Sequence, residues 1–386
     1  MSNDIHRVVV LGAGYAGLTA ATRLSREVDA SAVEITLVNA SPDFVERPRL
    51  HQVATGQDVA VHPLAPILAD RDVSLLVGYA REIDTEAKTV TVSTDDDVTD
   101  LPYDTLVYAL GSRVDTTTVP GIRSHAHILG DIGSSTALHE ALPADGTVVV
   151  CGGGLTGIEA ACELAESRPD LTVRLVSRGA PGAWLSPGAR KHLDAALARL
   201  GVQVTSGVTI TSIEADHVAL ADDRIPFDAC LWAGGFDVPD LAARAGLTVD
   251  AKGRAVVDDR LRSVSHPEIH VIGDAAALAG TWGSDLSYGC RVAGFMGPYA
   301  ADAIAAELAG RTAPAFKFRY IHQCVSLGRK DAVIQFVHAG DESPRNAVLR
   351  GRVAVWYKDL VLGSAVWLFS KPGPYLPHRK VRPASA

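Results

Sequence analysis

Short runs of consecutive apolar residues, each followed by a glycine-rich turn, are the most regular feature of the chain. The first run occupies residues 8–11 and leads into Gly12-Ala-Gly14-Tyr-Ala-Gly17, after which a helix-like stretch covers 18–24. A further apolar run follows at 34–39. Unbroken apolar runs of this length are typical of strands buried in a parallel sheet. The pattern therefore predicts a strand, a tight turn, a helix and a second strand.

The same pattern recurs later in the chain. An apolar run at 148–151 is followed by Gly152-Gly-Gly154-Leu-Thr-Gly157, a helix-like stretch at 158–165 and a strand-like run at 171–177. One GxGxxG sequence is weak evidence because glycine occurs in many turns, but here both copies have the expected flanks. The repeat predicts two dinucleotide-binding folds.

Each glycine of the GxGxxG turn has a physical function. The first allows the tight turn, the second lets the backbone approach a pyrophosphate, and the third lets the helix pack closely on the strand. The helix N-terminus then faces the phosphate charge.

Other apolar segments extend these two units. Strand-like runs at 106–111, 229–233 and 269–272 each end in glycine, and the last of them is followed by Gly273-Asp274. A helix-like stretch covers 288–308. Both units therefore have enough strands for an α/β fold with parallel sheets.

The chain changes character from about residue 313. Aromatic and β-branched residues alternate over 316–337, which indicates strands in a separate C-terminal α+β unit. The apolar run at 360–369 is too short to span a membrane, so we expect a buried core segment rather than an interfacial membrane or substrate-facing helix. Four prolines after residue 371 predict an extended tail.

Composition excludes several classes of protein. Of the 386 residues, 47% are hydrophobic and 21% charged, which is typical of a folded globular protein. The formal net charge of -9 argues against a nucleic-acid-binding surface. No apolar run reaches the length of a membrane-spanning helix, and contact with a membrane surface is not favoured. The sequence carries no signal for an oligomeric state.

The five cysteines, Cys151, Cys162, Cys230, Cys290 and Cys324, contain no CxxC or CxxxxC pair. This spacing excludes a sequence-local redox disulfide and a zinc ribbon. Together with a short polar N-terminus, it leads us to expect a cytoplasmic protein. No HExxH sequence is present, and His125 with His127 is expected to be a loop pair, so no metal site is predicted.

Two dinucleotide folds in a chain without a local redox dithiol favour a flavin and a nicotinamide as the ligands. At this point the chain resembles the two-dinucleotide-binding flavoprotein reductases over roughly residues 5–310. The resemblance rests on VVVLGAGYAGLTAA, TLVYALGS, VVVCGGGLTGIEAACEL, CLWAGGF and HVIGDAA. Within that superfamily, PDFVERPRLHQVATG at 42–56 is most similar to type II NADH dehydrogenases, and its Glu46-Arg47-Pro48 is also similar to apoptosis-inducing-factor-like reductases.

The resemblance implies a domain organisation. Residues 1–115 and 262–312 would form an FAD domain, split by an inserted NAD(P) domain at 116–261. Residues 313–386 would form the C-terminal domain on the acceptor side.

The resemblance also assigns FAD-binding residues. Gly12, Gly14 and Gly17 would hold the pyrophosphate, and Gly273-Asp274 the ribityl and phosphate end. The turn from Ala109 through Gly111 to Ser112 would form a second FAD contact, and Arg47-Pro48 would lie near the isoalloxazine. Asn39 stands where the family usually has an acid for the adenosine ribose; an amide can still bind a hydroxyl, and the alternative is a simple turn residue.

In the second unit, Gly152, Gly154 and Gly157 would bind the NAD(P)H pyrophosphate. Glu159 matches a glutamate that type II NADH dehydrogenases place beside flavin and nicotinamide, where it would orient the carboxamide or relay a proton. The alternative is an exposed first-turn Glu, favoured by the helix dipole. Ser177-Arg178 replaces the acid of NAD-selective folds and favours NADPH, with NADH as the alternative. A further alternative is that Arg178 is an ordinary solvated arginine without a function in binding.

The acceptor side departs from the family. Type II NADH dehydrogenases carry two quinone-site glutamines in the helix after the Gly-Asp motif, and Cys290-Arg-Val-Ala-Gly-Phe295 takes their place here. Arg291 and Phe295 would give a cationic and aromatic lining, which weakens a respiratory quinone assignment and suits an anionic or aromatic acceptor. Tyr320 and His322 are further candidate lining residues, and core or surface aromatics are the alternative.

The sequence therefore predicts an FAD-dependent NAD(P)H oxidoreductase. Hydride would pass from NAD(P)H to flavin N5 and electrons then to a quinone-like or other small organic acceptor. Alternatives are a reductase of a ferredoxin-type carrier protein, which the net charge does not favour, and a slow-turnover redox sensor. A third possibility, redox chemistry at Cys290 and Cys324, is disfavoured because isolated cysteines usually behave as small hydrophobes.

Overall fold

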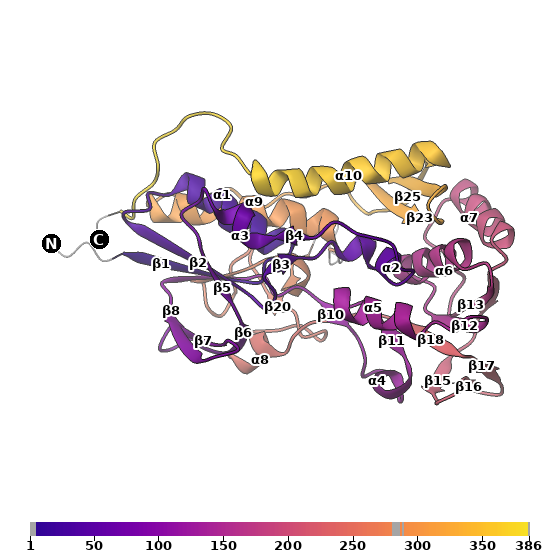
Figure 1. Ribbon diagram of the computed structural model, residues 1–386. Helices are drawn as coiled ribbons and strands as arrows, with labels where there is room; N and C mark the ends of the chain where they lie inside the picture. The colour runs from indigo at the N-terminus through magenta and orange to yellow at the C-terminus, as the bar shows by residue number, and fades with distance from the viewer. Residues whose placement is uncertain (1–4, 280–285, 288, 385–386) are drawn as a thin grey trace.

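Two parallel five-stranded sheets are the centres of two units that lie end to end in the computed structural model, which describes residues 5–279, 286–287 and 289–384 (Figure 1). The first sheet has the strand order β21-β9-β1-β2-β5. Its strands are β1 (His6–Leu11), β2 (Val33–Asn39), β5 (Ser74–Val77), β9 (Thr105–Tyr108) and β21 (Ile269–Val271). Because β21 follows the second unit in the chain, the first sheet is assembled from two separate stretches.

Helices α1 (Tyr15–Glu27) and α9 (Cys290–Leu308) pack against each other on one face of the first sheet (Figure 1). Small residues allow this close approach. A Cβ on Gly297 would lie 2.4 Å from the carbonyl oxygen of Ala16, so glycine is required at that crossing. The packing fixes the first turn of α9 near the glycine turn that precedes α1.

The second sheet has the order β11-β18-β12-β13-β14. Its strands are β11 (His127–Ile128), β12 (Gly146–Cys151), β13 (Leu171–Ser177), β14 (Gln203–Ser206) and β18 (Ala229–Trp232). Residues 148–151 of β12 are fully buried, as expected for a strand covered on both faces. The associated helices are α5 (Ile132–Ala141), α6 (Leu155–Ser167) and α7 (Pro187–Arg199).

Smaller elements complete the two units. Antiparallel three-stranded sheets are formed by β6 (Tyr79–Asp84), β7 (Thr89–Ser93) and β8 (Val98–Pro102), and by β15 (Ile210–Ile213), β16 (His217–Leu220) and β17 (Arg224–Pro226). The remaining elements are β3 (Asp43–Phe44), η1 (Arg47–Arg49), α2 (Leu50–Val53), β4 (His62–Pro63), α3 (Leu64–Leu68), β10 (Arg113–Val114), α4 (Ile122–His125), β19 (Phe236–Asp237), α8 (Leu241–Arg244), β20 (Ala255–Val256), η2 (Gly273–Ala275) and β22 (Ala276–Ala277).

The C-terminal unit consists of an antiparallel sheet and one long helix. The sheet contains β23 (His322–Ser326), β24 (Ala332–Val337) and β25 (Pro344–Arg350), and α10 (Arg352–Ser370) packs on β24, β25 and α1. Figure 1 shows α10 along the outer edge of the molecule, over the sheet at one end and beside α1 at the other. The other packing partner of β23 is α6 of the second unit.

The prediction that residues 360–369 are buried in the core is wrong. Only one side of α10 faces the protein, and Leu360, Trp367 and the preceding Trp356 are 54%, 51% and 65% exposed. An unbroken apolar run in a helix covers all sides, so a helix that packs on one side only must expose part of it. By length and composition alone α10 would also pass for a membrane-spanning helix, with 22% of its apolar window buried.

The predicted fold class is confirmed: two Rossmann-like units and a C-terminal α+β unit. The predicted strands at 34–39 and 171–177 correspond to β2 and β13. The predicted helix at 288–308 corresponds to α9 from Cys290 onward, and residue 288 lies outside the described residues. After Lys371 the chain is extended, as predicted, with an isolated bridge between Val381 and Val28.

Candidate active site

The carboxyl ends of β1, β9 and β21 are adjacent in the first sheet, and the loops that follow them meet at one edge. Ligands of α/β proteins bind outside the carboxyl ends of parallel strands. These loops contain the predicted FAD residues Gly12 to Gly17, Ala109 to Ser112 and Gly273-Asp274. The topology therefore brings the three predicted FAD segments together.

The first glycine turn has the shape that a pyrophosphate requires. A Cβ on Gly12, whose φ is +96°, would lie 2.5 Å from the Ala109 carbonyl oxygen, and one on Gly17 would lie 1.9 Å from that of Gly12. Gly14 instead faces open space and is the N-cap of α1, with no side chain capping the helix. Gly12 and Gly17 therefore pack closely against the backbone, while the N-terminus of α1 at Gly14 is open and uncapped. This arrangement fits an FAD pyrophosphate.

Asp274 links two of these loops. Its carboxylate accepts hydrogen bonds from Ser112 Oγ at 2.6 Å and from the Gly289 amide at 2.8 Å, just before α9. Arg47 Nη1 donates to the Ser112 carbonyl at 2.6 Å, and its guanidinium lies 5.6 Å from the centre of the Phe236 ring. Burial lowers the pKa of Arg47, although Asp274 partly offsets the effect. Arg47, Pro48 and Asp274 thus surround the same sheet edge.

The side chain of Asn39 supports the glycine turn. Its Oδ1 accepts from the Ala13 amide at 2.9 Å, and its Nδ2 donates to the Ser41 carbonyl at 2.8 Å. These bonds are those of a turn residue. The ribose contact stays a prediction.

The second glycine turn repeats the geometry of the first. A Cβ on Gly152 would lie 2.4 Å from the Ala233 carbonyl oxygen, and one on Gly157 would lie 1.8 Å from that of Gly152. Gly154 faces open space at the uncapped N-terminus of α6. This edge of the second sheet therefore fits a second dinucleotide.

At the end of β13, Ser177 is buried and its hydroxyl donates to the Gly179 carbonyl at 2.7 Å. Arg178 is exposed. Of the two residues that were predicted to favour NADPH, Arg178 is the exposed one, whereas the Ser177 hydroxyl is used inside the turn.

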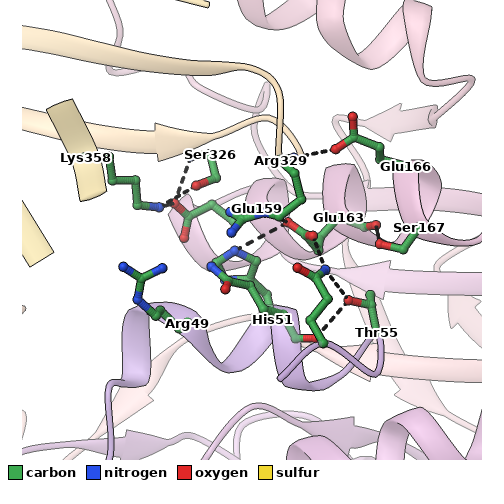
Figure 2. A network of polar contacts seen from close by, with 12 residues as sticks. Arg49, His51, Thr55, Glu159, Glu163, Glu166, Ser167, Ser326, Arg329 and Lys358 are labelled. Carbon is green, nitrogen blue, oxygen red and sulfur yellow. Dashed lines mark hydrogen bonds and ion pairs between the residues drawn. The ribbon is translucent and has the colours of Figure 1, made fainter. Parts of the chain in front are cut away.

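Glu159 is buried in a polar network where the second unit meets the C-terminal unit (Figure 2). Its carboxylate accepts a hydrogen bond from the Ser326 amide at 2.9 Å and pairs with the ammonium group of Lys358 on α10. Lys358 Nζ also donates to Ser326 Oγ at 2.6 Å. The alternative of an exposed first-turn glutamate is therefore wrong, because Glu159 is only 8% exposed.

Charge keeps Glu159 ionised despite its burial. Burial alone would raise its pKa, but the Lys358 ammonium group and the Ser326 amide outweigh that effect and lower it. A buried carboxylate that is held by one lysine is suited to accept and return a proton.

The four predicted acceptor-side residues lie in one chain of contacts. The Arg291 guanidinium stacks 4.9 Å from the centre of the Tyr320 ring, and Arg291 Nη1 donates to the His322 carbonyl at 3.4 Å. Phe295 is 55% exposed and packs edge-on against Phe318, which in turn packs against Tyr320.

The charge of Arg291 is already compensated. Its Nη2 pairs with Glu342 and donates to Ser287 Oγ at 2.8 Å. The Arg291 charge that was expected to attract an anionic acceptor is therefore already paired. Tyr320 is only 3% exposed and belongs to the core, as its alternative predicted, and the lining roles of Phe295 and His322 stay predictions. His322 contacts Tyr357, at a distance of 5.2 Å between ring centres.

All five cysteines are free. Burial raises the pKa of the Cys290 thiol, and it raises the pKa of the Cys324 thiol to about 12. Thiolates are the reactive form, so both environments oppose redox chemistry at these cysteines. No group of three or more potential metal ligands occurs among the described residues, and neither His125 nor His127 belongs to one.

Sequence reasoning missed the partners of Glu159. Glu163 lies on the same helix as Glu159, whereas Lys358, Ser326 and His51 come from three distant segments. One signal was available for Lys358. It lies four residues after Ala354 and four before Leu362, which places the lysine on the same helix face as these two apolar residues.

A known protein family matches most of the chain. The sequence profile of the family described as pyridine nucleotide-disulphide oxidoreductase matches residues 6–295. The chain belongs to this family. It is thus an oxidoreductase that uses FAD and a nicotinamide dinucleotide. The geometry of the two glycine turns fits these ligands, and their assignment as the binding sites stays a prediction.

Relatives of this oxidoreductase support the closer resemblance. An NADH dehydrogenase-like protein of Mycobacterium tuberculosis is 30% identical over 296 residues, which cover 70% of this chain and 73% of that protein. A demethylphylloquinone reductase of Synechocystis sp. is 26% identical over 401 residues, 97% of this chain and 99% of that protein.

A solved structure shares the whole fold. The NDH2 of Plasmodium falciparum, determined in complex with NADH, superposes with a TM-score of 0.80 at 14% identity and covers 95% of this chain and 96% of that one. The C-terminal unit is therefore part of the shared fold.

Proposed function

We propose that this flavoprotein is an NADPH:quinone oxidoreductase of the cytoplasm that works at a membrane surface. The buried Glu159–Lys358 pair is the observation that carries the proposal. It joins the helix after the second glycine turn to the acceptor-side unit, where a proton would be needed. The demethylphylloquinone reductase of Synechocystis sp., which matches this chain over nearly its full length, supports a quinone as the acceptor.

The residues have separate tasks in this reaction. Gly14 and Gly154 open the two turns to the pyrophosphates. Bound FAD would accept hydride from the nicotinamide and pass the electrons onward. Glu159 would then hold the proton that the reduced acceptor takes up, and Lys358 would keep that carboxylate ionised and in place between transfers.

The choice of NADPH rests on Arg178. It is exposed at the end of β13, where a carboxylate would bind the ribose hydroxyl of NADH and repel a 2′-phosphate. An arginine there can donate to the phosphate.

The outer face of α10 supports contact with a lipid surface. Val353, Trp356, Leu360 and Trp367 are all more than half exposed and recur at helical spacing, so that they form one apolar stripe. Arg352 and Lys371 stand at the two ends of the helix. A stripe of this kind, with tryptophans and flanking cations, is typical of helices that lie in a membrane interface.

The test is a panel of electron acceptors. Purified protein should contain FAD, and anaerobic NADPH should bleach it. A short-chain ubiquinone should then restore the yellow colour faster than a ferredoxin does. Fast reoxidation by ferredoxin alone would support a carrier-protein reductase instead, and bleaching without fast reoxidation by any acceptor would support a redox sensor.

A further inference from the structure

His51 is a buried histidine that none of the functions above uses. It lies on α2, it is 4% exposed, and its Nε2 has no hydrogen-bond partner among the described residues. Figure 2 shows its ring between Glu159 and Glu163, two carboxylates on successive turns of α6. A buried imidazole nitrogen without a partner is costly, so its retention calls for a function.

Glu163 connects this histidine to the protein surface. Its Oε2 lies 3.8 Å from His51 Nε2 and accepts from Arg329 Nε at 3.2 Å, while Oε1 accepts from Gln57. Glu163 itself is fully buried, but the Arg329 side chain is 35% exposed. The Arg329 side chain therefore links the Glu163 carboxyl group to water.

Charged groups surround His51 on several sides. Glu159 and Glu163 face it from α6, Lys358 from α10, Arg329 from the loop after β23, and Arg49 from the preceding turn. Helix α5 also packs on this region and brings His139 against Gly56. Burial lowers the pKa of His51 to about 3, so the ring is neutral at physiological pH, with one nitrogen protonated and the other free.

We propose that Glu163 and His51 form a proton route that refills Glu159 from water. This proposal rests on the proposed function, because a quinone takes up two electrons and two protons to become a quinol. The hydride of NADPH supplies both electrons and one of the protons, and the other proton must come from water. Glu163 gives its carboxyl proton to His51 Nε2, while Nδ1–H of the same ring passes a proton to the Glu159 carboxylate. Glu163 is then reprotonated from water beside Arg329 and Gln57, and the ring resets its tautomer.

The electrostatics distinguish the two carboxylates. Burial raises the pKa of Glu163 in spite of Gln57 and Arg329, whereas the pKa of Glu159 is lowered. Glu163 therefore binds a proton more readily than Glu159 does, so the transfer to Glu159 is uphill and needs an acceptor that removes the proton, and the ring never needs to hold a second proton. Transfer occurs when the reduced acceptor draws a proton from the Glu159 side.

The experiment follows reoxidation of prereduced holoenzyme by ubiquinone-1, a two-proton acceptor, and by ferricyanide, which takes electrons alone. The variants are His51→Gln and Glu163→Gln, with Glu159→Gln as the comparison at the end of the route. Glu140→Gln is the matched control, since Glu140 is an exposed glutamate on α5. Rates are measured across pH and in H2O and D2O.

Both route variants should slow reoxidation by ubiquinone-1 about tenfold and increase its solvent isotope effect. Reoxidation by ferricyanide should stay at the wild-type rate, and Glu140→Gln should match wild type with both acceptors. Equal loss with both acceptors would assign a structural role, and unchanged ubiquinone rates and pH profiles would exclude the route. If wild type reduces ferricyanide but no quinone, the proposed function fails and the route with it.

Discussion

The proposed choice of NADPH depends on a single residue, Arg178. Its exposed guanidinium stands at the end of β13, whereas the neighbouring Ser177 hydroxyl is used inside the turn. The acid found in NAD-selective folds is absent at this strand end. We therefore propose that the charge of Arg178, and not a cluster of charges, discriminates NADPH from NADH.

Replacing Arg178 by Ala should raise the KM for NADPH by about tenfold to a hundredfold, because a charge-assisted bond to phosphate contributes about 1.5–3 kcal/mol. The KM for NADH should not change. Steady-state rates with each nicotinamide check this, with the exposed Arg224→Ala on β17 as control. A wild-type enzyme that uses NADH better than NADPH at every concentration would contradict the assignment.

The residues of the glycine motifs could be predicted individually from the sequence, but contacts between distant residues could not. Gly12 and Gly152 are recognised from spacing because backbone geometry alone requires glycine there. Lys358 and Glu159 are far apart in the chain, and their pairing depends on how α10 docks on the second unit. No local pattern encodes that docking.

At the scale of elements, α10 has an unusual distribution of side chains. Its inward face carries Ala354, Lys358, Leu362 and Phe369, so a lysine is buried there while two tryptophans are exposed. The sequence predicted burial of 360–369 because an apolar run has no polar side to mark its outward face. The strands β2 and β13 were predicted well, because both faces of a central parallel strand are covered.

The exposed stripe makes a prediction about membrane binding. Replacing Trp356 and Trp367 by Ser should reduce sedimentation with vesicles of phosphatidylcholine and phosphatidylglycerol several-fold, because both rings lose their apolar contact with the interface. Activity with water-soluble ubiquinone-1 should be retained. Tyr79→Ser, at an exposed aromatic on β6, is the control. Equal sedimentation of wild type and the double variant would exclude this surface.

At the scale of the whole molecule, polar contacts hold the C-terminal unit on the second unit. Asp331 before β24 accepts from His192 Nε2 and Arg199 Nη2 of α7, each at 2.8 Å, and from the Gly351 amide at 3.1 Å. Burial raises the pKa of Asp331, but these partners outweigh it and lower the pKa. The two units were predictable from sequence, while this contact between them was not.

Asp331→Asn should lower the thermal unfolding midpoint at neutral pH, because it removes charged hydrogen bonds that contribute about 2 kcal/mol. The pKa of Asp331 is lower in the folded state, so this stability is present above the unfolded value of about 4 and is lost as pH falls through the folded value. The midpoints of variant and wild type should therefore converge in acid.

The control is Asp222→Asn, at an exposed aspartate, which should show no difference from wild type at either pH. A gap that persists undiminished at low pH would assign the effect to packing.

The central claim is that electrons pass from NADPH through FAD directly to a quinone. Anaerobic double mixing in a stopped-flow instrument tests it most directly, with one equivalent of NADPH followed by one equivalent of ubiquinone-1. The account predicts complete bleaching of the flavin, complete return of its absorbance in the second mix, and one quinol formed per NADPH. A flavin that stays bleached after the quinone is added would contradict it.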